Sequence, residues 1–124
     1  MANEKILIVD DEENIRLLYE QELRDEGYQT VLAEDGKDCL EKVKLHAPDL
    51  IILDIRMPRM DGLEAISRII ELNKNIPVIL NTAYSTYKDD FMSWAADAYV
   101  VKSHNLDELK STIKEILVNK KSEA

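Results

Sequence analysis

The chain has little of several residue types, and each shortage excludes a class of protein. Its single cysteine, Cys39, excludes an internal disulfide and a zinc site built from several thiolates, which is typical of a reducing compartment. The longest apolar runs have four or five residues, far fewer than the ~20 that span a bilayer. The first residues also lack the pattern of a secretory signal peptide. We therefore expect a cytoplasmic protein with no membrane partner.

Positive charge is also in short supply. The chain has 16 Lys and Arg residues against 25 Asp and Glu residues, so its formal charge is −9 at pH 7. Binding to nucleic acid or to an anionic membrane surface requires basic residues that displace counterions. Direct contact with DNA or RNA is therefore not expected.

The chain does contain enough apolar material for one core, because 45% of its 124 residues are hydrophobic. Five short runs rich in Val, Ile and Leu predict buried parallel strands. These runs are Ile6–Val9, Thr30–Ala33, Leu50–Leu53, Val78–Leu80 and Tyr99–Val101. Helical spacing predicts five helices, marked in turn by Leu18 and Tyr19, Val43 and Ala47, Ile66 and Ile70, Phe91 and Met92, and Leu109 and Ile113.

Residues at the ends of these segments support the same alternation. Gly27 follows the first predicted helix as a cap, Pro48 closes the second, and Asn105 followed by Glu108 is typical of a capping box. Five strand and helix pairs in turn predict an α/β fold with a parallel sheet and helices on both faces. We expect one domain over residues 1–124, with its core at about 5–118 and a frayed polar tail over 119–124.

Polar side chains follow the predicted strands at the points where ligands bind in open α/β sheets. Asp10 and Asp11 follow the first strand and Asp54 follows the third, while Thr82 and Lys102 follow the fourth and fifth. If the first and third strands are neighbours, the three aspartates meet, and their like charges require a cation. Oxygen ligands without thiolates favour Mg²⁺, or alternatively Mn²⁺.

Simpler interpretations apply to some of these residues. Glu12 and Glu13 fit a role in capping the next helix, because acids complement the helix dipole there. Asp54 closes the most hydrophobic strand, where a carboxylate is costly unless it has a partner or a function. Lys102 is either a solvated cap or a point charge that pairs with Asp54 or with a phosphate.

Four segments in this order, KILIVDDEE, PDLIILDIRMPRMDGLE, PVILNTAY and ADAYVVKS, resemble the receiver domain of bacterial two-component response regulators. The resemblance extends from about Lys5 to Leu117, and the DxxMPxxDG pattern that begins at Asp54 is its most specific part. It implies a flavodoxin-like (βα)5 three-layer sandwich with a five-stranded parallel sheet of order 2-1-3-4-5.

The resemblance also implies roles for individual residues. Asp54 would accept a phosphoryl group from phosphohistidine on a sensor histidine kinase or a histidine phosphotransfer protein. Asp10, Asp11, Asp54 and the backbone carbonyl of Arg56 would hold Mg²⁺, with Asp11 as a direct ligand and Asp10 acting partly through water. Lys102 would bind the phosphoryl oxygens.

Two further residues would transmit the signal in this family. The Thr82 hydroxyl would move toward the phosphate, and the Tyr99 ring would follow it. The surface of the fourth helix, fifth strand and fifth helix would then change for a downstream target protein. Without the resemblance, Tyr99 would be read as core packing and Thr82 as a helix cap.

The resulting expectation is a stand-alone signalling switch that catalyses its own phosphorylation and slow dephosphorylation, not an enzyme with other substrates. The sequence ends about seven residues after the last predicted core position, so no attached output domain is expected. A phosphorelay intermediate is the alternative. A haloacid-dehalogenase phosphatase fits less well because Asp10-Asp11-Glu12 does not match its DxD arrangement. A receiver that binds without phosphorylation and a flavodoxin-like cofactor protein are further alternatives.

Three further features, two of them departures from the family pattern, lead to separate expectations. Ser103 stands where proline is usual, so we expect a trans Lys102–Ser103 peptide and a change in how Lys102 is aimed. The resemblance implies that the residues two positions beyond Asp54 and Thr82 tune the lifetime of the phosphate, and because Arg56 and Tyr84 at these positions are bulky, we expect restricted water access and a long-lived phosphate. The fourth helix is rich in aromatic residues, which is consistent with either a partner surface or core packing.

Overall fold

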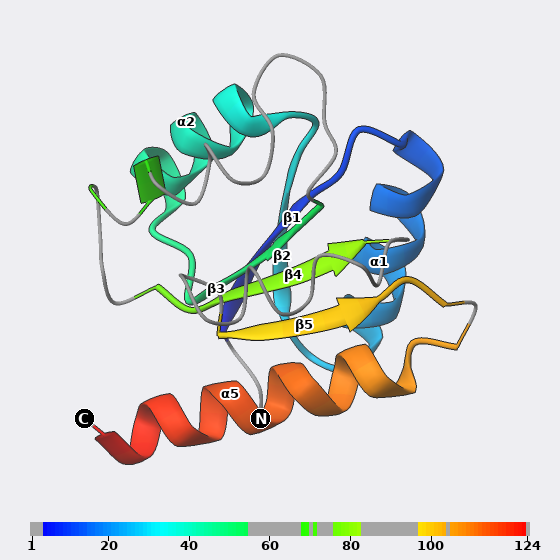
Figure 1. Ribbon diagram of the computed structural model, residues 1–124, viewed down its shortest axis with the longest axis vertical. Helices are drawn as coiled ribbons and strands as arrows, with labels where there is room; N and C mark the ends of the chain where they lie inside the picture. Colours follow the sequence, from blue (N-terminus) through cyan, green and yellow to red (C-terminus); the bar gives the residue numbers. More distant parts are fainter. Residues whose placement is uncertain are drawn as a thin grey trace.

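The computed structural model describes residues 4–54, 68–69, 71, 76–82, 97–103 and 105–123 (Figure 1). Within them, five parallel strands form one sheet in the order β2-β1-β3-β4-β5, as predicted. The strands are β1 (Lys5–Val9), β2 (Gln29–Ala33), β3 (Leu50–Leu53), β4 (Val78–Thr82) and β5 (Ala98–Val101). The helices are α1 (Glu13–Asp25), α2 (Gly36–His46) and α5 (Asp107–Glu123). The marker residues of the predicted third and fourth helices, Ile66, Ile70, Phe91 and Met92, lie outside the described residues.

Both faces of the sheet are covered by helices, because alternate strand residues point to opposite sides. Ile6 and Ile8 of β1 belong to a buried cluster with residues of α1 and α5, whereas Leu7 and Val9 belong to a cluster with residues of α2. Figure 1 shows α2 on one side of the sheet, with α1 and α5 on the other. The expected three-layer arrangement is therefore confirmed.

The end of α1 shows how the local sequence fixes the fold. Gly27 has a φ of 95°, a conformation that costs little energy only for glycine. The Gly27 N–H donates to the Arg24 carbonyl at 2.9 Å, and the Tyr28 N–H donates to the Leu23 carbonyl at 3.2 Å. These two bonds form a Schellman motif, which ends α1 and turns the chain into β2. The predicted cap at Gly27 is confirmed.

Other helix ends differ in detail from the expectations. Ala47 lies beyond α2 and caps it in the left-handed conformation, with a φ of 46°, so it is not a core position. Leu18 is 45% exposed, because the buried stripe of α1 is centred on Tyr19 and Leu23. Asn105 accepts a hydrogen bond from the Asp107 N–H at 2.8 Å, not from Glu108 as a capping box requires.

Several predicted segments were too short: strands β1, β2 and β5 each begin one residue earlier than predicted, and two other elements end later. The expected tail is helical as far as Glu123, because no proline or glycine interrupts the helix-forming residues after Leu117. Strand β4 continues through Asn81 to Thr82, since these residues pair in register with Val100 and Val101. In the described parts of the chain, no helix combines the length and apolar character needed to cross a membrane.

Candidate functional site

Asp10 and Asp54 lie side by side at the carboxyl edge of the sheet. Val9 and Leu53, the residues before them, are partners in the β1–β3 register. The Asp54 N–H donates to the Val9 carbonyl at 3.1 Å, which extends this pairing by one step. The two side chains are only 2% and 6% exposed. Two carboxylates this deeply buried need compensating positive charge.

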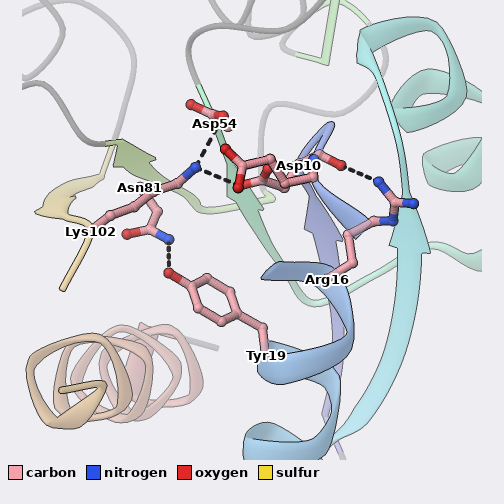
Figure 2. Close-up of polar contacts among 7 residues, drawn as sticks. Asp10, Arg16, Tyr19, Asp54, Asn81 and Lys102 are labelled. Carbon is pink, nitrogen blue, oxygen red and sulfur yellow. Dashed lines mark hydrogen bonds and ion pairs between the residues drawn. The ribbon is translucent and has the colours of Figure 1, made fainter. Parts of the chain in front are cut away.

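Lys102 supplies that charge from the end of β5. Its Nζ lies 2.8 Å from Asp10 Oδ2 and 3.2 Å from Asp54 Oδ2, so one ammonium group bridges both carboxylates (Figure 2). Burial alone would lower the pKa of Lys102, but its hydrogen bonds and charge interactions with Asp10 and Asp54 outweigh burial and raise it. Lys102 is therefore a fixed cation at neutral pH.

Asp11 and Glu12 extend the acidic group toward solvent. Carboxylate oxygens of Asp10, Asp11 and Glu12 all lie within 4.8 Å of one another, with Asp10 buried and the other two exposed. Such a set of oxygen donors fits Mg²⁺, which binds one or two carboxylates and keeps several waters. Together with Asp54 the set formally carries four negative charges, and among the described residues Lys102 pairs with two of these carboxylates while Arg16 bonds to the Asp10 carbonyl. This imbalance favours a divalent cation.

The backbone between β1 and α1 is held by hydrogen bonds that the sequence alone does not predict. Asp10 Oδ1 accepts a hydrogen bond from the Glu12 N–H at 2.9 Å, and Arg16 Nη1 donates to the Asp10 carbonyl at 2.7 Å. Glu12 occupies the N-cap position of α1, as expected, but its side chain makes no capping bond. The carboxylate of Glu12 therefore stays with the acidic group.

A second unanticipated contact lies beneath Lys102. Asn81 Nδ2 donates a 2.6 Å hydrogen bond to the hydroxyl of Tyr19 on α1. Burial raises the pKa of Tyr19, and the bond from Asn81 and the charge of Lys102 offset part of this rise. Asn81 follows the apolar residues of β4, so the sequence marks it as unusual. The sequence does not identify its partner, because Tyr19 lies 62 residues away along the chain.

The structure describes some of the remaining predicted residues and not others. Thr82 is the last residue of β4, but its side chain, like all of Arg56 and Tyr84, lies outside the described residues. Tyr99 is 8% exposed and belongs to the buried cluster on the α2 face.

The expected trans peptide after Lys102 is confirmed, because the described backbone contains no cis bond. Ser103 Oγ accepts a hydrogen bond from the Asn105 N–H at 3.2 Å, and Lys102 still reaches both aspartates.

The structure thus brings Asp10, Asp54 and Lys102 together from the ends of β1, β3 and β5, with Asp11 beside Asp10. The arrangement can bind a hard cation and present a carboxylate oxygen beside an ammonium group. These are the requirements for accepting a transferred phosphoryl group, a reaction that depends mainly on alignment and charge neutralisation.

Comparison with known proteins gives consistent results. The sequence profile described as "Response regulator receiver domain" matches residues 6–114. Sporulation initiation phosphotransferase F of Bacillus subtilis is 39% identical over 119 residues, which cover 94% of this chain and 96% of that protein. The chain spans only about half the length of other relatives, including the transcriptional regulatory protein PhoP of the same organism, which is 35% identical over 49% of its own length.

Solved structures that are similar in both fold and sequence include two of the same protein. Response regulator TrrA of Thermotoga maritima, in complex with Mg²⁺-BeF, is 51% identical with a TM-score of 0.86, over 90% of this chain and 97% of that one. The same protein in complex with the histidine kinase ThkA gives a TM-score of 0.85 at 51% identity, over 92% of this chain and 98% of that one.

Proposed function

The chain belongs to the response regulator receiver domain family, and from that premise we propose that it accepts a phosphoryl group on Asp54 from a phosphohistidine donor. The observation that carries this proposal is the position of Lys102 Nζ between Asp10 and Asp54. A histidine kinase is the proposed donor, and the complex between TrrA and its kinase supports this choice. We place the reaction in the cytoplasm.

The proposed transfer is a displacement at phosphorus. An Asp54 carboxylate oxygen attacks the phosphorus, the N–P bond of phosphohistidine breaks, and the imidazole nitrogen keeps the electron pair and takes up a proton. Lys102, already paired with Asp54, is placed to bind the phosphoryl oxygens. Because the nucleophile and the cation are held by separate strands of one rigid sheet, little reorganisation is needed before transfer.

Asp10, Asp11 and Asp54, with the backbone carbonyl of Arg56, are the proposed ligands of Mg²⁺. The TrrA complex with Mg²⁺-BeF supports this choice of ion. When bound, the ion would neutralise charge on the phosphoryl oxygens. Glu12 is a further carboxylate in the same group and was not among the expected ligands.

We propose that the output of the switch passes through Thr82 and Tyr99. Thr82 ends β4, and Tyr99 is the register partner of Leu80 in the neighbouring strand, so the two residues belong to adjacent strands. Movement of the Thr82 hydroxyl toward the phosphate and of the Tyr99 ring behind it would alter the surface that a target protein binds.

The proposal is tested with phosphoramidate, a small donor that contains an N–P bond. Intact-mass measurement of the wild-type protein with Mg²⁺ is expected to show the gain of one phosphoryl group. The same measurement with EDTA, or on Asp54→Asn, is expected to show none. A wild-type protein that gains no phosphoryl group with Mg²⁺ would contradict the proposal.

A relay role is the second candidate, because a relative that this chain covers over 96% of its length is called a phosphotransferase. A relay intermediate would pass its phosphoryl group from Asp54 to a histidine of a phosphotransfer protein. Mixing phosphorylated protein with purified histidine phosphotransfer domains tests this alternative. Rapid transfer to a histidine would favour the relay, whereas retention of the group on Asp54 would favour the stand-alone switch.

A further inference from the structure

Asn81 and Tyr19 form a buried polar pair on the α1 side of the candidate site. Both residues are 2% exposed, and their 2.6 Å hydrogen bond joins strand β4 to helix α1. Figure 2 shows this bond next to Lys102, with Asp10 and Asp54 on the opposite side of the lysine. The proposed phosphoryl-acceptor mechanism does not use either residue.

Core packing does not require a polar pair at this position. Tyr19 belongs to the same buried cluster as the apolar residues Ile79, Val100 and Leu109. Apolar side chains at positions 19 and 81 could therefore also pack against this cluster. Burying an amide and a phenol is costly unless they bond to each other, and replacing both by apolar groups is often neutral for stability. A hydrogen bond, however, imposes a direction and a distance that apolar contact does not.

The pair connects the parts of the chain that carry the site. Asn81 directly precedes Thr82 and is the register partner of Val100, two residues before Lys102. Tyr19 lies on α1, the helix whose Arg16 holds the Asp10 carbonyl. The bond therefore links the helix beside Asp10 to β4, which ends at Thr82, and through it to β5, which ends one residue before Lys102.

A pocket next to the pair makes this link more important. The pocket, of about 220 Å³ and partly open to solvent, is lined by Tyr19 and Asn81, and by Ser103, Leu106 and other residues of β5 and the start of α5. Side chains that border such a pocket have fewer protein packing contacts on that side. The hydrogen bond thus supplies a constraint that close packing does not provide there.

We propose that the hydrogen bond between Tyr19 and Asn81 is a positioning device that holds the end of β4, and through it Thr82 and Lys102, in place against α1. Tyr19 and Asn81 are positioning residues that do not contact the transferred group. The inference rests on the proposed phosphoryl transfer, because its effect is measured on that reaction.

The test compares Tyr19→Phe with the double variant Tyr19→Phe/Asn81→Leu. Tyr19→Phe leaves the buried amide of Asn81 without its acceptor, so we expect a lower urea midpoint. It should also slow phosphorylation by phosphoramidate by roughly tenfold, as small misplacements of reacting groups do. The double variant removes the orphaned amide and should recover the urea midpoint. It should remain roughly tenfold slow, because the directional link is still missing.

Mg²⁺ affinity separates positioning from general damage. Asp10 and Asp11 lie at the start of α1 and Asp54 follows β3, so none of these proposed ligands belongs to β4, and both variants should bind Mg²⁺ within about twofold of the wild type. Binding of BeF₃⁻ in the presence of Mg²⁺, which imitates the phosphoryl group, should weaken by roughly tenfold, in step with the rate.

Two controls complete the design. Ile113→Val removes one methylene from the same buried cluster without touching the pair, and should lower stability while leaving the rate unchanged. Tyr28→Phe removes a phenol hydroxyl from a residue packed against this cluster beside β2, and should also leave the rate unchanged.

Each outcome discriminates between possibilities. A double variant that regains both stability and the wild-type rate would overturn the inference, as would a Tyr19→Phe variant with an unchanged rate. Equal slowing in Ile113→Val would assign the effect to stability and would also overturn it. Failure of the wild type to gain a phosphoryl group would overturn the proposed function and, with it, this inference.

Discussion

Among the single residues of the candidate site, Lys102 has the largest effect on its charge, because it pairs with two carboxylates. Its ammonium group lies between two buried carboxylates, which raise its pKa despite burial. A raised lysine pKa means that the folded state binds the proton more tightly than the unfolded state. The resulting stabilisation is complete below the ordinary value of 10.5 and is lost as pH rises through the higher folded value.

Replacing Lys102 with methionine keeps the aliphatic stem and removes the charge. Asp10 and Asp54 then face each other without their shared cation, so we expect a loss of about 1–3 kcal/mol in unfolding free energy in EDTA. Mg²⁺ should recover much of this loss, because a bound cation offsets the same carboxylates. Urea unfolding of both proteins, with EDTA and with saturating Mg²⁺, measures the difference. An equal loss in both conditions would contradict this account of Lys102.

Cys39 gives a pH-dependent prediction away from the site. Its thiol is fully buried in α2, and burial first, then the charges of Asp38 and Asp35, raise its pKa from 9.0 to about 12. The unfolded chain therefore loses this proton earlier than the folded chain as pH rises. Stability from this group is intact below pH 9 and is lost between pH 9 and 12.

The expected loss is about 1 kcal/mol between pH 9 and 10. Cys39→Ala should lower stability at neutral pH, because it leaves a small cavity, but should show a shallower decline above pH 9. Urea midpoints of the two proteins from pH 7 to pH 10 provide the comparison. Parallel declines would contradict the assignment to Cys39.

The sequence allowed only some site residues to be recognised. Asp10, Asp54 and Lys102 could be placed because each directly follows a predicted strand, and parallel strands end at one edge. Arg16 and Asn81 could not, because their roles depend on partners that only the folded chain supplies. The grouping of Glu12 with Asp10 depends on the backbone conformation between β1 and α1, in which the Glu12 N–H bonds to the Asp10 carboxylate. The sequence alone does not specify this conformation.

At the scale of helices and strands, two helix ends adopt the same left-handed conformation with different residues. Gly27 follows α1 with a φ of 95°, and Ala47 follows α2 with a φ of 46°. A Cβ atom is strained in this region, whereas glycine is not. Gly27 meets the conformational demand without strain, and Ala47 does not.

Gly27 and Ala47 should respond in opposite ways when glycine and alanine are exchanged at these two positions. Ala47→Gly should raise the unfolding free energy by about 0.5 kcal/mol, because relief of strain exceeds the added freedom of the unfolded chain. Gly27→Ala should lower it by about 1 kcal/mol. Urea unfolding measures both, and each variant serves as the control for the other. A loss of stability in Ala47→Gly would contradict the strain at the end of α2.

Most elements could be predicted from the sequence, but their ends could not. The apolar runs located all five strands, since strands buried on both faces are almost continuously apolar. Strand β4 appeared to end at Leu80 because Asn81 is polar, yet its backbone stays paired with β5. Helix α5 was expected to fray from Asn119, but a polar sequence is no barrier to an exposed helix.

For the whole molecule, topology is what creates the site. Strands β1 and β3 are neighbours although β2 lies between them in the sequence. Strand β2 is added on one side of β1, and β3, β4 and β5 follow on the other side. Asp10 and Asp54 end these two strands, and Lys102 reaches them from β5 across the end of β4. Apolar runs alone predict a parallel sheet but not its strand order. The order 2-1-3-4-5 was implied by the family resemblance.

The central claim is that this topology makes Asp54 the phosphoryl acceptor, and the position of the phosphoryl group tests it most directly. After phosphorylation with phosphoramidate and Mg²⁺, borohydride reduces an aspartyl phosphate to homoserine, and trypsin then releases residues 45–56. This peptide contains both Asp49 and Asp54, and tandem mass spectrometry distinguishes them. The account predicts homoserine at position 54 only, formed only with Mg²⁺. Homoserine at Asp49, Asp10 or Asp11, or equal labelling without Mg²⁺, would contradict it.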